Sequence, residues 1–111
     1  MVAEKSTVLK LNNKKLDLNY KLFENDALVF KSMQSEAITI LENDKPILKI
    51  NFAGFPNFGI WTKHNAPFIC LEPWYGYSDT DKSTQQIVEK EGIQFLKPNA
   101  IFNATYSIEI L

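Results

Sequence analysis

The sequence has 111 residues, 45% of them hydrophobic and 23% charged, a composition that suits one globular domain with a modest core. Its 12 basic residues, all lysines, nearly balance 13 acidic residues, so the chain lacks the footprint of a nucleic-acid binder and the arginine clamp used for phosphate. One cysteine excludes an internal disulfide framework, and residues 1–6 contain no apolar signal core. Because no apolar run approaches the ~20 residues of a membrane span, we expect a cytoplasmic protein without a membrane partner.

Short apolar runs with a period of two predict an all-β chain. In chain order, the runs that are typical of strands are residues 8–11, 27–30, 37–41, 46–52, 68–71 and 105–110. Turn-forming residues separate them, for example at 43–46. Strands of about five residues at close spacing favour an antiparallel sandwich, with residues 1–111 as a single domain. Residues 83–90 are the one helix candidate, with an irregular loop as an equal alternative.

Glu72 is the strongest candidate for a catalytic residue. It follows the apolar run at 68–71 and precedes Pro73, Trp74 and Tyr75. A carboxylate walled by aromatic side chains is partly desolvated, and desolvation makes it a better proton acceptor. Pro73 lacks a backbone donor, so we expect the strand to end at Glu72. Trp74 can also stack on the apolar face of a sugar ring, while a plain surface glutamate at a strand end is the alternative.

Asp26 and His64 are weaker candidates. Asp26 stands immediately before the apolar run at 27–30, where an aspartate usually completes a turn through its side chain but can also bind a ligand hydroxyl. His64 is the single histidine and lies in a polar loop at 61–67, which is typical of a solvated side chain. One histidine without a cysteine cluster gives no pattern for a metal site.

Two stretches, 55–62 (FPNFGIWT) and 66–76 (APFICLEPWYG), resemble the C-terminal part of aldose 1-epimerases, the galactose mutarotase-like family. Weaker similarities occur at 22–30 (LFENDALVF), 92–98 (GIQFLKP) and 106–110 (YSIEI). The resemblance covers about residues 14–111, and the phrase around Glu72 is its most specific part.

This resemblance implies a β-supersandwich fold and an isomerase that interconverts the α and β anomers of an aldose sugar, a hexose, without a cofactor. The family's general base is the glutamate of the shared phrase, which falls on Glu72. The family's aspartate that binds a sugar hydroxyl falls on Asp26. The family's general acid, a histidine, and its substrate-binding arginine lie upstream of the region that this chain resembles. We therefore expect the N-terminal part of the fold, or another chain, as a partner.

Two other interpretations stay open at the level of sequence. The chain could be a non-catalytic carbohydrate-binding relative, in which Glu72, Asp26 and Trp74 only hold a sugar. It could also be a structural sheet fragment that pairs edge to edge into an oligomer, because strand-like residues begin and end the chain.

Overall fold

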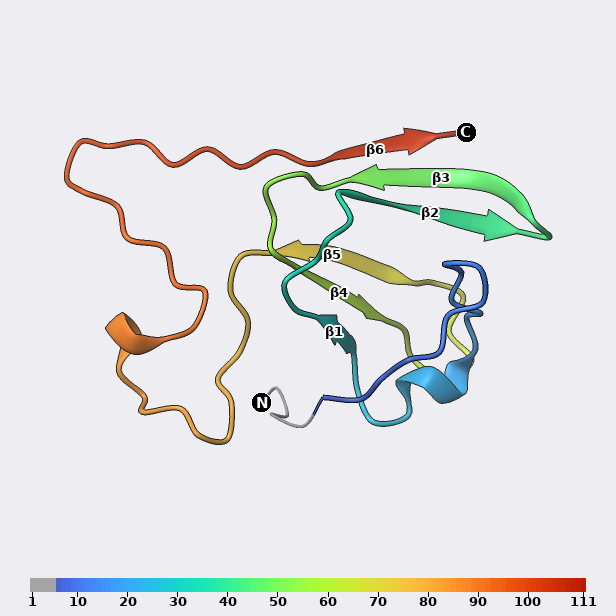
Figure 1. Ribbon diagram of the computed structural model, residues 1–111, viewed down its shortest axis with the longest axis horizontal. Coiled ribbons are helices and arrows are strands. Elements are labelled where there is room, and N and C mark those ends of the chain that lie inside the picture. The colour runs from blue at the N-terminus through green and yellow to red at the C-terminus, as the bar shows by residue number, and fades with distance from the viewer. Residues whose placement is uncertain (1–5) are drawn as a thin grey trace.

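A computed structural model of the chain describes residues 6–111, which form two antiparallel three-stranded β-sheets (Figure 1). In chain order the elements are the 3₁₀ helix η1 (Tyr20–Phe23), β1 (Leu28–Phe30), β2 (Ala37–Glu42), β3 (Lys45–Asn51), β4 (Asn57–Trp61), β5 (Cys70–Trp74), the 3₁₀ helix η2 (Ile87–Glu89) and β6 (Ser107–Ile110). One sheet has the strand order β1-β4-β5, and the other has the order β2-β3-β6. The prediction of an all-β antiparallel sandwich is confirmed.

The core lies where the two sheets face each other. Its buried members are Phe23, Ile50, Phe52, Phe58 and Ile60. Phe52 and Phe58 are both 0% exposed, and their ring centroids are 4.6 Å apart. Phe30 of β1 lies opposite Phe58 of β4 in the register, so these side chains share the core-facing side of their sheet. Because side chains alternate along a strand, the strand residues next to Phe30 and Phe58 in sequence point to the outer face of the sheet. This outer face holds the candidate site.

The hairpin between β2 and β3 follows from its two connecting residues. Asn43 and Asp44 both have positive φ angles, 49° and 61°, as a type I′ turn requires, and Asn and Asp tolerate this conformation better than most residues. The predicted turn at 43–46 is thus confirmed. The tip of the hairpin is tied to the preceding chain by an ion pair between Lys15 and Asp44, 3.2 Å from Nζ to Oδ1.

The sequence patterns missed one strand of the first sheet and ended another too early. Residues 57–61, which the sequence analysis placed only in the family phrase 55–62, form β4, the central strand, in which residues 57–60 are all buried. Strand β5 does not end at Glu72 but continues to Trp74. The reason is that β5 is an edge strand. An edge strand tolerates a proline, because one side of its backbone makes no hydrogen bonds within the sheet.

The remaining differences lie near the ends of the chain. Residues 8–11 form no strand, and they are followed by an isolated bridge between Asn12 and Lys15. Of the two alternatives for residues 83–90, the loop is the one observed, and it contains the 3₁₀ turn η2. The expectation of no signal core concerned residues 1–6, and of these only Ser6 is among the described residues. Within residues 6–111, no helix is long and apolar enough to span a membrane.

Candidate active site

Glu72 lies in the middle of β5, on the outer face of its sheet. In the register it pairs with Gly59 of β4, and Gly59 in turn pairs with Val29 of β1. Leu71 belongs to the opposite, core-facing side, where it packs against the buried cluster. The alternation of strand residues therefore places Glu72 and Trp74 together on the outer face, and Glu72 is half-buried there.

Two indole groups hold the Glu72 carboxylate. Trp61 Nε1 donates a hydrogen bond to Oε1 at 2.8 Å, and Trp74 Nε1 donates one to Oε2 at 3.1 Å. An indole N–H is a donor only, and an ionised carboxylate is an acceptor only, so the arrangement is complementary to the carboxylate anion. Each carboxylate oxygen has a further lone pair available for a ligand hydroxyl. The pair of indoles thus fixes the carboxylate in orientation while leaving it able to accept a proton.

Gly59 makes room for this arrangement. A Cβ atom at position 59 would lie 2.7 Å from Cζ2 of the Trp74 indole, well inside van der Waals contact. The indole therefore lies across the β4 backbone directly opposite Glu72. Trp61 is oriented by an edge-to-face contact with Phe68, with ring centroids 5.6 Å apart.

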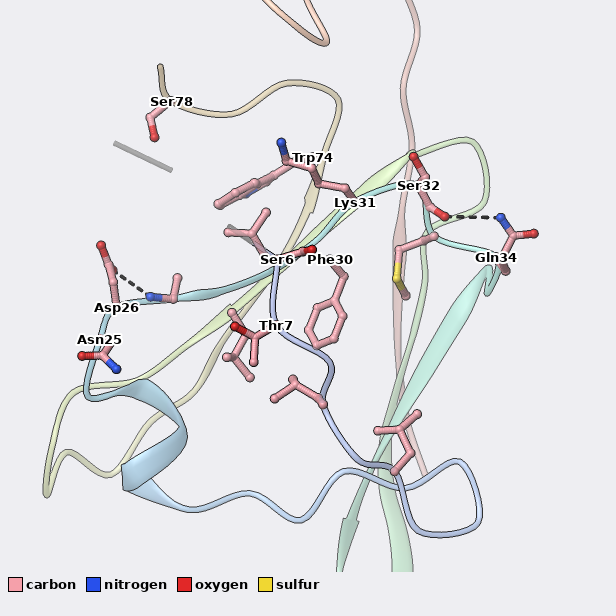
Figure 2. A pocket seen from close by; sticks show the side chains of 16 residues that line it. Ser6, Thr7, Asn25, Asp26, Phe30, Lys31, Ser32, Gln34, Trp74 and Ser78 are labelled. Atoms are coloured by element: carbon pink, nitrogen blue, oxygen red, sulfur yellow. Dashed lines mark hydrogen bonds between the residues drawn. The ribbon is translucent and has the colours of Figure 1, made fainter. Parts of the chain in front are cut away.

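A groove of about 870 Å³ borders this site and runs along β1. Its lining includes Asp26, Trp74 and Ser78, which Figure 2 shows around the same end of the groove. Glu72 does not line the groove. Trp74 consequently connects the two features, because its ring forms part of the groove wall while its N–H holds the carboxylate.

Asp26 fills the turn role that its position suggested, and it lies on the groove wall. Its backbone has a φ of 98°, and its Oδ1 accepts a hydrogen bond from the Ala27 N–H at 2.7 Å. The side chain therefore completes the turn that leads into β1, as aspartates before strands usually do. Its second carboxylate oxygen has no hydrogen-bond partner among residues 6–111, and the residue is exposed on the groove wall. That oxygen is available to a ligand hydroxyl.

A charged cluster stands at the rim of the groove. Lys31 Nζ lies 4.3 Å from the centre of the Tyr77 ring and 3.6 Å from Glu91 Oε2. The adjacent Tyr77 hydroxyl, followed by the charge of Glu91, raises the pKa of Lys31. The same hydroxyl, followed by the Lys31 charge, lowers the pKa of Glu91, while burial raises the pKa of Tyr77. These contacts favour the charged forms of Lys31 and Glu91.

His64 is not joined to Glu72. It is exposed, and its ring contacts Tyr20 edge to face, with centroids 5.4 Å apart. The side-chain hydrogen bonds of Glu72 come from the two indoles instead. Within residues 6–111, no group of three or more His, Cys, Asp or Glu side chains is placed to hold a metal ion.

Sequence reasoning missed three residues of the site. Trp61, Gly59 and Asn57 appeared in the sequence analysis only as parts of a family phrase. Asn57 is buried and joins two segments, because its Oδ1 accepts from the Ser32 N–H at 3.2 Å and its Nδ2 donates to the Tyr75 carbonyl at 2.8 Å. Once residues 57–61 are known to form a strand, the period of two places Asn57, Gly59 and Trp61 on one face.

Comparisons with known proteins find LacX proteins as relatives. The chain is 33% identical over 102 residues to the chromosomal LacX protein of Lactococcus lactis subsp. lactis, and equally to the plasmid LacX protein of the same organism. Each match covers 90% of this chain but 34% of the relative, so the chain spans about a third of the length of the curated relatives it matches. No protein-family profile and no solved structure matches the chain.

Proposed function

We propose that this chain carries the general base of an aldose 1-epimerase-type sugar isomerase, and that the base is Glu72. The observation that carries the proposal is the Glu72 carboxylate held by two indole N–H groups on an open sheet face. The likeness of residues 66–76 to the aldose 1-epimerase glutamate phrase supports it. The substrate is a hexose, the reaction interconverts its α and β anomers, and no cofactor takes part.

The reaction requires two proton transfers. A base removes the proton from the C1 hydroxyl, the bond between C1 and the ring oxygen breaks, and an acid protonates that oxygen. Rotation about the C1–C2 bond and reversal of both proton transfers then closes the ring on the other face. Glu72 accepts the first proton, because its carboxylate is fixed in orientation and keeps a free lone pair.

Asp26 and Trp74 bind the sugar in this proposal. The Trp74 ring forms a flat apolar wall of the groove, suited to the C–H face of a hexose, and the free carboxylate oxygen of Asp26 suits a sugar hydroxyl. The general acid and an anchoring arginine come from outside these residues, so the chain by itself supplies half of the acid–base pair.

A second function, carbohydrate binding without catalysis, is favoured by one observation. Glu72 stays outside the groove that Asp26 and Trp74 line. In this reading the carboxylate only positions the Trp74 ring, and the groove holds a sugar without opening it.

Polarimetry distinguishes the two functions. A hybrid polypeptide in which this chain replaces the matched stretch of LacX should accelerate mutarotation of freshly dissolved α-D-glucose or α-D-galactose, and the chain alone should not. Glu72→Gln should remove the acceleration, whereas the matched carboxylate-to-amide change Glu42→Gln, at an exposed end of β2, should leave it intact. A hybrid that binds sugar, seen by tryptophan fluorescence, but never accelerates mutarotation would support the binding function instead.

A further inference from the structure

The C-terminal segment, residues 94–111, is exposed at every position. It carries eight large exposed apolar side chains: Phe95, Leu96, Ile101, Phe102, Tyr106, Ile108, Ile110 and Leu111. In Figure 1 its last part runs as an extended strand along one edge of the molecule and ends in β6. Single exposed apolar residues are ordinary, but a contiguous series of this size marks an interaction surface.

The apolar face of β6 continues the core-facing side of its own sheet. Ile108 pairs with Ile50 of β3, and Ile110 pairs with Leu48. Ile50 is 3% exposed, whereas Ile108 is 57% and Ile110 is 86% exposed. The same face of the sheet is therefore covered over β3 and uncovered over β6.

The backbone of β6 is also unpaired on one side. β6 is an edge strand, since β3 is its one neighbour among residues 6–111. The Leu111 N–H bonds the Ile47 carbonyl at 3.1 Å, and antiparallel ladders alternate, so the N–H and C=O groups of Ile108 and Ile110 point away from β3. An edge with free backbone groups and an apolar face is a template for a further strand.

We infer that the free edge of β6, together with the face that bears Ile108 and Ile110, forms a docking surface for the part of a LacX-length polypeptide that lies outside the match. An extended strand of that part pairs with the free edge of β6, and its apolar side chains cover Ile108 and Ile110. The relatives supply the argument for this occupant. About two thirds of their length lies outside the match, which is ample to supply such a strand. The inference is independent of the proposed function.

Pull-down of the tagged 111-residue chain, co-expressed with the part of LacX outside the match, tests the docking. We expect a one-to-one complex. Ile110→Lys puts a charge on the docking face and should weaken the complex about tenfold or more. The matched change Leu111→Lys lies on the opposite face of the strand and should have less than about a threefold effect. Equal effects of the two changes, or no complex, would overturn the inference.

Amide hydrogen exchange gives a second readout that does not need the separate LacX part to fold. In the 111-residue chain, the amides of Ile108 and Ile110 should exchange faster than those of Glu109 and Leu111, which face β3. In the hybrid polypeptide with the LacX remainder, all four should be protected. Persistent fast exchange at 108 and 110 in the hybrid would contradict the docking. A stable dimer of the chain alone, with 108 and 110 already protected, would assign the edge to a second copy instead.

Discussion

Replacing Gly59 by alanine should loosen the Glu72 site although it adds one methyl group. The new Cβ would lie 2.7 Å from Cζ2, 3.0 Å from Cε2 and 3.1 Å from Cη2 of the Trp74 indole. These distances are below the ~3.5–4.0 Å of normal carbon contacts. The indole must move off the β4 backbone, and its 3.1 Å hydrogen bond to Glu72 Oε2 is then lost or lengthened.

The free energy of unfolding should fall by about 2 kcal/mol in Gly59→Ala. Overpacking of this kind costs about 1–3 kcal/mol, and a lost hydrogen bond to a charged group adds about 1.5–3 kcal/mol where water does not replace it. Trp74 is half-buried, so water can partly replace the lost hydrogen bond, and the total cost stays near the lower end of these ranges. In the opposite direction, alanine in a strand is favoured over glycine by about 0.5–1 kcal/mol.

Urea unfolding followed by tryptophan fluorescence measures this effect, because both tryptophans of the chain bond to Glu72. The midpoint should fall by about 1 M. In a Trp74→Ala background the obstruction is absent, so the same Gly59→Ala change should raise stability. If Gly59→Ala is neutral or stabilising while Trp74 is present, the packing of the indole on the glycine is refuted.

Two further predictions concern the supports of the site. Asn57→Ala should cost about 2–4 kcal/mol in urea unfolding, because it leaves the Ser32 N–H and the Tyr75 carbonyl without their buried partner; a loss below about 0.5 kcal/mol would contradict this. The pKa of Glu91 is held below the ordinary 4.5 by its neighbours, so its stabilisation is present above that pH and disappears as the pH falls through the lower folded-state value. The small stability advantage of the wild type over Glu91→Gln at pH 7, measured by thermal unfolding, should therefore vanish in acid, and an advantage that grows there would have the wrong sign.

Period-two patterns were sufficient to predict the fold class and most strands, because strands with one buried face repeat apolar residues at that spacing. They failed at β4, which is buried on both faces and contains Gly59, so that it carries no alternation of polarity. They also placed the end of β5 two residues early. Proline usually ends a ladder, but at position 73 it belongs to an edge strand, a fact that depends on strand order and not on local sequence.

The sequence indicated the surroundings of Glu72 and Asp26, but it did not indicate the contributions of Trp61, Gly59 and Asn57 or the contacts among them. The aromatic setting of Glu72 and the turn role of Asp26 followed from neighbouring residues. The bond from Trp61 to Glu72 did not, because it crosses from β4 to β5 and depends on their register. The position of Glu72 outside the groove likewise depends on how the Trp74 side chain is directed, because Trp74 lines the groove while its N–H bonds to the Glu72 carboxylate.

Steady-state mutarotation kinetics of the hybrid polypeptide test the central assignment, Glu72 as the general base. Glu72→Gln keeps the size of the side chain and one acceptor oxygen for an indole N–H, but it removes the proton acceptor. The account predicts that kcat falls by about 10²–10⁴-fold while KM for the sugar changes little, because Asp26 and Trp74 still line the groove. A Glu72→Gln hybrid with an undiminished kcat would contradict the assignment.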